Sequence, residues 1–205
     1  MVYILLQREG LVLLTKESSQ HVPFSSEAVR NQEIVDKNKF EEELSAAFSQ
    51  FKPSKCVIFL GEELVFQQAF LLSDSLDQAL VQEKQSFRDA IPFASIQLKD
   101  RSVRINEQEQ YFVVNSSLYE SVTTVLVSLG WRVTKVLPLQ ALINVSVTPT
   151  ISFELLNSLN FRSKLTQQLS FLNGQKSPFH TMMYFGVFTA LCICIVIIVY
   201  LVLFY

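Results

Sequence analysis

Short runs of apolar residues, separated by polar turns, fill the first part of the chain and predict alternating strands and helices. Residues 2–7 and 11–15 are strand-like and are joined by a turn at residues 8–10, so we expect a β-hairpin. A polar stretch broken by Pro23 follows, and Asp36 is a candidate N-cap for the first helix. Its inward face is predicted by apolar side chains at helical spacing: Phe40, Leu44, Ala47, Phe48 and Phe51.

The middle of the chain continues this mixture of elements. Strands are expected at residues 55–60, 64–71, 95–98, 103–105, 110–114 and 131–137. Helices are expected over about 76–90 (capped by Asp74 or Ser75), from Ser116 or Ser117 to Gly130, and from Pro138 to about 142. This mixture predicts one α+β domain over residues 1–144.

Beyond residue 144 the pattern changes. We expect an edge strand at 145–150, an amphipathic helix at 155–172 and a hinge at 173–178, so residues 145–183 are assigned as a juxtamembrane segment. Residues 184–205 contain no charged side chain. As a helix they extend about 33 Å, against about 30 Å of bilayer hydrocarbon. The pattern predicts a C-terminal transmembrane helix over residues 184–205.

The distribution of charge predicts the orientation of this helix. Arg162, Lys164 and Lys176 precede residues 184–205 and no charged residue follows them, so the positive-inside rule keeps the N-terminal domain in the cytoplasm. The apolar patch at residues 2–6 is too short for a signal peptide. We therefore expect a single-pass membrane protein, in the inner membrane if the organism is bacterial, with the lipid bilayer as one partner.

Composition argues against several classes of function. The glycines lie far apart in the chain, which excludes the usual Gly-rich phosphate loops: they are Gly10, Gly61, Gly130, Gly174 and Gly186. His21 and His180 have no ligand partners at metal spacing, and the acidic run 41–43 is typical of a solvated helix face. The formal net charge of −2 with scattered basic residues disfavours nucleic acid. We expect no catalytic residue, cofactor or metal.

Small side chains recur every fourth residue within the predicted membrane helix. Gly186, Ala190 and Cys194 share one helix face, which is the candidate face for packing against another membrane helix and so for a homo-oligomer. The alternative is a chance spacing, which is common in apolar helices of this length.

The order of elements resembles the N-terminal half of the actin-like PilM and GspL class, cytoplasmic components of type IV pilus and type II secretion assembly platforms. Four segments resemble the family's strand–Asp–helix unit, its paired strands, its helix ending in an "IPF" turn, and the strand, helix, strand and Pro that follow. These segments are residues 31–48, 55–72, 85–93 and 111–142. The resemblance implies a partial actin-like domain of the strand-helix-strand-strand type.

The departures from the family pattern affect the expected function. Where nucleotide-binding members have a Gly- and Ser-rich turn, this chain has residues 7–10, Gln-Arg-Glu-Gly. The second half of an actin-like fold also has no room in about forty residues between Leu142 and the predicted span. The resemblance therefore implies a non-enzymatic scaffold or adaptor of a pilus or secretion platform, whose partners are inner-membrane platform proteins.

Two alternatives remain open. A tail-anchored trafficking protein with a longin-like N-terminal domain would share the opening hairpin, but residues 151–178 are too short and irregular for the heptad motif of about fifty residues that such a protein carries. An enzyme would need polar groups that converge in a pocket.

Overall fold

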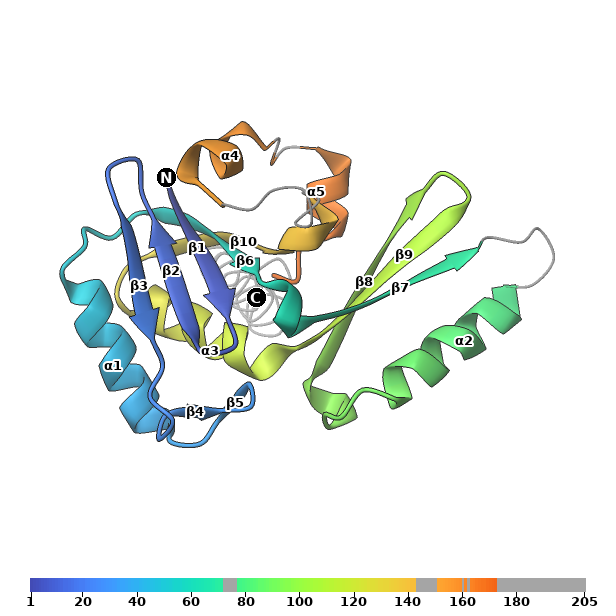
Figure 1. The fold of residues 1–205 in the computed structure, drawn as a ribbon, viewed down its shortest axis with the longest axis horizontal. Helices are drawn as coiled ribbons and strands as arrows, with labels where there is room; N and C mark the ends of the chain where they lie inside the picture. The colour runs from blue at the N-terminus through green and yellow to red at the C-terminus, as the bar shows by residue number, and fades with distance from the viewer. Residues whose placement is uncertain (72–76, 143–150, 160, 162, 173–205) are drawn as a thin grey trace, which may run out of the picture. The chain divides into compact units, whose positions relative to one another are not determined.

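Two β-sheets form the framework of the protein in the computed structural model, which describes residues 1–71, 77–142, 151–159, 161 and 163–172. Met1–Phe171 form one compact unit. The larger sheet contains, in spatial order, β10 (Arg132–Pro138), β6 (Lys55–Leu60), β1 (Val2–Gln7), β2 (Gly10–Leu14) and β3 (Ser19–Pro23). The smaller sheet contains β7 (Val65–Leu71), β9 (Gln108–Asn115) and β8 (Leu98–Ile105). The chain is a mixed α+β protein (Figure 1).

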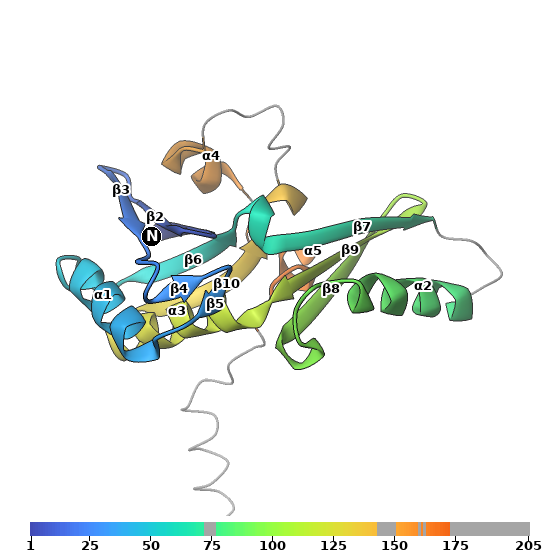
Figure 2. The same cartoon turned by 60° about the horizontal axis from the view of Figure 1, so that its bottom comes forward.

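The central strands of the larger sheet, β1 and β6, are buried, and helices lie on both faces of the sheet. Strand β6 pairs in parallel with β1 and β10, while β2 pairs antiparallel with both β1 and β3. Helices α1 (Lys37–Ser49) and α3 (Ser116–Ser128) lie on one side of this sheet, and α4 (Phe153–Ser158) lies on the other (Figure 2). A strand covered on both faces is expected to be apolar throughout, and all residues of β6 after Lys55 are buried.

The predicted opening hairpin and first helix are confirmed. The Asp36 side chain accepts a hydrogen bond from the Lys39 backbone N–H at 3.1 Å, and Phe40, Leu44 and Phe48 are buried. The polar stretch after the hairpin also contains regular structure. It contains β3 and a short hairpin of β4 (Val29–Arg30) and β5 (Glu33–Ile34).

Two predicted details of the next helices need correction or lie outside the described residues. The N-cap of α3 is Asn115, not Ser116 or Ser117, because the Asn115 side chain accepts a hydrogen bond from the Ser117 backbone N–H at 3.1 Å. Gly130 follows α3 with φ of +83°, as a helix stop requires. Asp74 and Ser75, the candidate caps of α2 (Asp77–Asp89), lie outside the described residues.

The smaller sheet differs from the three short strands expected between residues 95 and 114. Residues 95–97 form the 3-10 helix η2 (Ser95–Gln97), and β8 and β9 then pair over eight residues each. In the sequence, the charged residues Asp100 and Arg101 interrupt the apolar pattern, but both have polar partners. Arg88 of α2 forms an ion pair with Asp100, and the Arg101 Nε donates to the Ser170 carbonyl at 2.9 Å. Polar partners therefore keep charged residues within one continuous strand.

Helix α2 packs on one face of the smaller sheet through its own apolar cluster. The buried members of this cluster are Phe70, Ile91, Leu98, Tyr111 and Val113, with Phe66, Leu80, Phe87 and Phe93 packed against them. Lys84 of α2 forms an ion pair with Glu109 of β9, with 2.7 Å between Nζ and Oε1. Only 7% of the Glu109 side chain is exposed. Burial raises the pKa of Glu109, but the hydrogen bonds from Lys84 and Ser102 and the charges of Lys84 and Arg104 outweigh it, so the pKa lies below its ordinary value.

The single amphipathic helix predicted over residues 155–172 is wrong. The segment forms two shorter helices, α4 and α5 (Lys164–Gln168), each capped by a serine hydroxyl, Ser152 and Ser163. Leu159 is extended between them, and the buried leucines of the segment are Leu156 and Leu169. Tyr3 contacts Phe153 and Phe161 over one face of the larger sheet.

The remaining short elements are the 3-10 helices η1 (Glu62–Leu64), which joins β6 to β7, and η3 (Leu139–Ala141), which follows Pro138 as predicted. The expected edge strand 145–150, the hinge 173–178 and the predicted membrane helix 184–205 lie outside the described residues. Among the helices that are described, none is both long and apolar enough to cross a bilayer. The domain boundaries 1–144, 145–183 and 184–205 stay a prediction.

The close approach of β3 to Gly10 predicts that Gly10→Ala will destabilise the fold. A Cβ atom at residue 10 would lie 2.6 Å from the Val22 carbonyl oxygen and 3.0 Å from the Pro23 Cα, so backbone must move. We expect a loss of about 1–3 kcal/mol of unfolding free energy. In the matched variant Gly61→Ala, the added Cβ meets the flexible end of Glu63, and the cost should be below about 1 kcal/mol. Denaturant unfolding measures both losses, and equal losses would contradict the close approach of β3 to Gly10 as their cause.

The Lys84–Glu109 pair predicts a pH-dependent contribution to stability. The pKa of Glu109 is lower in the folded chain than in the unfolded chain. The contribution of Glu109 to the free energy of unfolding is therefore complete at pH values above its unfolded pKa of about 4.3, and it is lost as the pH falls through its folded pKa. Glu109→Gln should cost about 1–3 kcal/mol at pH 7, since Lys84 loses its partner. The difference from the native chain should shrink below about pH 4. The control is Glu107→Gln, an exposed neighbour, and a Glu109→Gln effect that is constant from neutral to acidic pH would exclude the pair as its cause.

Candidate functional site

The turn between β1 and β2 consists of Arg8 and Glu9, with Gln7 paired to Gly10. Gly10 is required here by the close approach of β3 and not by a ligand. The Arg8 backbone N–H donates a hydrogen bond to the Glu63 carboxylate at 3.1 Å. This backbone N–H of the turn is therefore already paired with an acidic side chain from η1. The turn therefore holds two long charged side chains, Arg8 and Glu9, with a second carboxylate, that of Glu63, beside them.

The short β4–β5 hairpin lies beside this turn and has an unusual backbone. Asn31 and Gln32 both have positive φ, 51° and 67°. Positive φ at both central residues defines a type I′ turn, which suits asparagine but is unfavourable for glutamine. Gln32 is held in place because its Nε2 donates to the Glu63 carbonyl at 2.9 Å and the residue is buried. The tie to η1 thus offsets the backbone strain.

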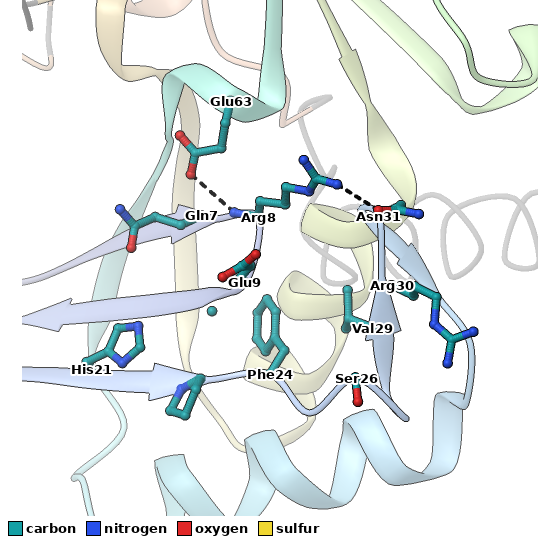
Figure 3. A pocket seen from close by; sticks show the side chains of 12 residues that line it. Gln7, Arg8, Glu9, His21, Phe24, Ser26, Val29, Arg30, Asn31 and Glu63 are labelled. Carbon is teal, nitrogen blue, oxygen red and sulfur yellow. Dashed lines mark hydrogen bonds between the residues drawn. The ribbon is translucent and has the colours of Figure 1, made fainter.

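Three elements that are distant in sequence are joined at this point. Figure 3 shows the Arg8 side chain lying between Glu63 and Asn31, and its Nη2 donates to the Asn31 Oδ1 at 2.6 Å. Together with the two hydrogen bonds to Glu63, this contact connects the β1–β2 turn, the β4–β5 hairpin and η1. We call the cavity beside them the turn pocket.

The turn pocket has a volume of about 680 Å³. Its lining residues are Gln7, Arg8, Glu9, Gly10, His21, Pro23, Phe24, Ser26, Val29, Arg30, Asn31 and Glu63. Phe24 contributes an apolar surface and packs edge-on against Phe40 of α1, with 5.4 Å between ring centroids. Charges of both signs surround it (Figure 3).

This arrangement has definite chemical preferences. A polyphosphate would meet the carboxylates of Glu9 and Glu63 as well as the guanidinium groups of Arg8 and Arg30. The backbone N–H of Arg8 already donates to Glu63. A polypeptide segment presents donors, acceptors and apolar side chains together, which the mixed lining matches. The mixed lining is therefore compatible with a bound peptide segment.

Among the described residues, those that the sequence singled out for chemistry lie on separate elements. His21 is in β3, opposite Val12, and lines the turn pocket, while the described residues contain no cluster of three His, Cys, Asp or Glu that could hold a metal. In the acidic run, Glu43 accepts a hydrogen bond from the Ser25 backbone N–H at 3.3 Å. Cys56 is fully buried in β6, and burial raises the pKa of its thiol to about 12. His180, Gly186, Ala190 and Cys194 lie outside the described residues.

Sequence reasoning missed the residues that build the pocket. Asn31 was visible in principle, because asparagine tolerates positive φ and favours tight hairpins. Gln32 and Glu63 gave no signal, since a glutamine in a left-handed conformation is explained only by its contact with a segment about thirty residues away.

No family model and no curated protein matches the chain. The solved structures that are similar to it include the following three. One is the cytoplasmic domain of EpsL, an inner membrane component of the type II secretion system of Vibrio cholerae. Its identity is 15% and its TM-score 0.41, over 67% of this chain and 56% of that chain. Another is the PilM–PilN type IV pilus biogenesis complex, with 14% identity and a TM-score of 0.43, over 66% of this chain and 46% of the other.

The third is a Bacteroides thetaiotaomicron protein of unknown function described as having an actin-like ATPase fold. It has 11% identity and a TM-score of 0.34, over 60% of this chain and 48% of that one. The solved structures thus include the two kinds of assembly protein that the sequence resembles. This chain spans about half the length of each. At these identities and TM-scores, the likeness assigns neither an activity nor a partner to this chain.

Proposed function

We propose that this protein is a non-enzymatic, membrane-anchored adaptor of an envelope assembly platform of the type IV pilus or type II secretion kind. In this proposal the described residues are a partial actin-like domain in the cytoplasm, and residues 184–205 are the single membrane helix. The domain binds a segment of a partner protein in the turn pocket.

The observation that carries the proposal is the way in which the described domain ends. The Phe171 backbone N–H donates to the Val136 carbonyl of β10 at 2.8 Å, and Phe171 is buried. Arg101 of β8 lies over the Phe171 ring, 5.6 Å from its centroid, and also holds the Ser170 carbonyl. The chain therefore leaves the domain from a fixed point that both sheets define.

This fixed exit suits a tethered binding module. Residues 172–183 separate the exit from the predicted membrane helix and, at no more than about 3.6 Å each, can extend about 43 Å at most. A domain held this close to the bilayer would meet partners in the same membrane at high effective concentration. A weak pocket–peptide contact then suffices for assembly.

The non-enzymatic part of the proposal rests on the residues at the β1–β2 turn. Arg8 and Glu9 stand where a phosphate cradle would need small residues, and Glu63 accepts the hydrogen bond of the Arg8 backbone N–H. In this proposal Arg8, Glu9 and Glu63 form a wall of the turn pocket and do not bind a phosphate.

The proposed anchor predicts that charge within residues 184–205 will release the protein from membranes. Ile195→Arg with Ile198→Arg places two guanidinium groups near the centre of the span, at about 2.5–3.5 kcal/mol each. We expect the fraction of protein that resists alkaline extraction to fall several-fold. Thr181→Arg, just outside the predicted span, should leave that fraction unchanged. Full membrane retention of the double variant would overturn the anchor.

The proposed binding site predicts position-specific crosslinking to a partner. A photoreactive amino acid at residue 30, in the pocket lining, should capture inner-membrane assembly proteins, identified by mass spectrometry of the detergent-purified complex. The same group at exposed Val127 of α3 serves as the matched control and should capture none. Addition of ATP and Mg²⁺ should not change the yield.

Two outcomes would contradict this assignment. Loss of the crosslink with ATP would identify the pocket as a nucleotide site. Equal capture from residues 30 and 127, or capture of proteins unrelated to an envelope platform, would remove the turn pocket as the partner site.

A further inference from the structure

The two sheets have four edge strands among the described residues, and three of them carry features that prevent pairing with another chain. Strand β8 has four charged residues: Lys99, Asp100, Arg101 and Arg104. Strand β10 has two charged residues and a register shift, and its Val136 carbonyl already accepts from Phe171. Strand β3 ends in Pro23. Charges, irregular register and proline are the usual protection of sheet edges.

The fourth edge, β7, has none of these features. Its sequence from Val65 to Leu71 is VFQQAFL, without charge, proline or glycine. All seven residues pair with β9 without a register shift, from Val65 opposite Val114 to Leu71 opposite Gln108. Leu71 is 76% exposed. A regular, uncharged edge with an exposed leucine is a template for another strand.

The sequence of β7 also has a local symmetry. Read outward from Gln68, Phe66 matches Phe70 and aliphatic Val65 matches aliphatic Leu71, while Gln67 and Ala69 differ in polarity. An antiparallel pair of identical strands places residues opposite each other in this order around a two-fold axis.

We propose that β7 pairs antiparallel with β7 of a second copy of this chain, with the two-fold axis at Gln68. The two three-stranded sheets become one six-stranded sheet. On the face that carries α2, Phe66 lies opposite Phe70 of the other copy, and on the reverse face exposed Leu71 lies opposite Val65.

The register follows from the same pattern. Moving the axis to residue 67 or 69 leaves two residues of β7 unpaired in each copy and places Phe66 or Phe70 opposite Gln68. An axis at Gln68 pairs all seven residues, aromatic with aromatic and aliphatic with aliphatic, which is the combination that stabilises cross-strand pairs. Register is well specified because both faces of the strand agree.

Charge favours a second copy as the occupant. Two copies of β7 bring no charged residues opposite each other, whereas two copies of β8 would set basic residues against basic residues when the two-fold axis lies at residue 99, 100, 101 or 104. Figure 2 shows α2 running along one face of the smaller sheet, which agrees with its packing on Phe70 and Tyr111. This inference does not depend on any partner in the turn pocket.

A charge-exchange experiment on the full-length chain in membranes tests the pairing. Two differently tagged copies are produced together, and co-isolation is measured after mild detergent extraction. Gln68→Lys in both copies sets two ammonium groups opposite each other and should lower co-isolation about tenfold. Gln68→Lys in one copy with Gln68→Glu in the other should restore it. Gln82→Lys, on the exposed surface of α2, is the control and should have no effect.

Cysteine crosslinking tests the register independently. With Cys192 and Cys194 changed to alanine and buried Cys56 left in place, copies carrying Gln67→Cys and Ala69→Cys are mixed. Residues 67 and 69 lie opposite each other in the proposed pairing, so the mixture should form disulfide-linked dimers about tenfold more than either variant alone.

The proposal is overturned if Gln68→Lys copies associate as well as native copies, or if the Lys–Glu combination associates no better than Lys–Lys. It is equally overturned if the 67/69 mixture gains no disulfide over the single variants. Unchanged unfolding temperatures of the variants establish that loss of association is not loss of fold.

Discussion

Burial of the single strand β6 is the constraint on which the rest of the structure depends. Every side chain from Cys56 to Leu60 is at most 1% exposed, and the strand pairs in parallel on both sides. Parallel neighbours cannot be joined by tight hairpins, so the chain must cross over a face of the sheet between them. Helix α1 lies on the connection into β6 and α3 on the connection into β10, and their apolar faces cover the same side. The smaller sheet is inserted in the long path between β6 and β10.

Sequence patterns predicted this framework well for those elements whose apolar spacing along the chain marks the face that is buried. The hairpin, α1 with its Asp36 cap, β6 and the stop at Gly130 were all visible, because local spacing and capping chemistry determine them. The errors arose where contacts distant in sequence decide the structure. Strand β8 continues through Asp100 and Arg101 because Arg88 and Ser170 satisfy those charges.

The candidate site shows the same division more sharply. The absence of a small-residue loop at residues 7–10 could be read directly, and the structure explains Gly10 by its contact with β3. The pocket beside it could not be predicted, because it exists only through the contacts of Arg8 with Asn31 and of Gln32 with Glu63. A left-handed glutamine is unfavourable by itself and is stable only in that setting.

The attachment of Phe171 to β10 also has a mechanical meaning. A force that pulls on the chain beyond Phe171 acts first on two hydrogen bonds and not on the paired strands. They are the bond from the Phe171 backbone N–H to the Val136 carbonyl and the bond from the Arg101 Nε to the Ser170 carbonyl. Contacts that are loaded one after another yield at lower force than a ladder of hydrogen bonds loaded together. Under tension the segment of α4 and α5 would therefore detach before β6 is disturbed, and the sheet core would stay folded while the protein lengthens.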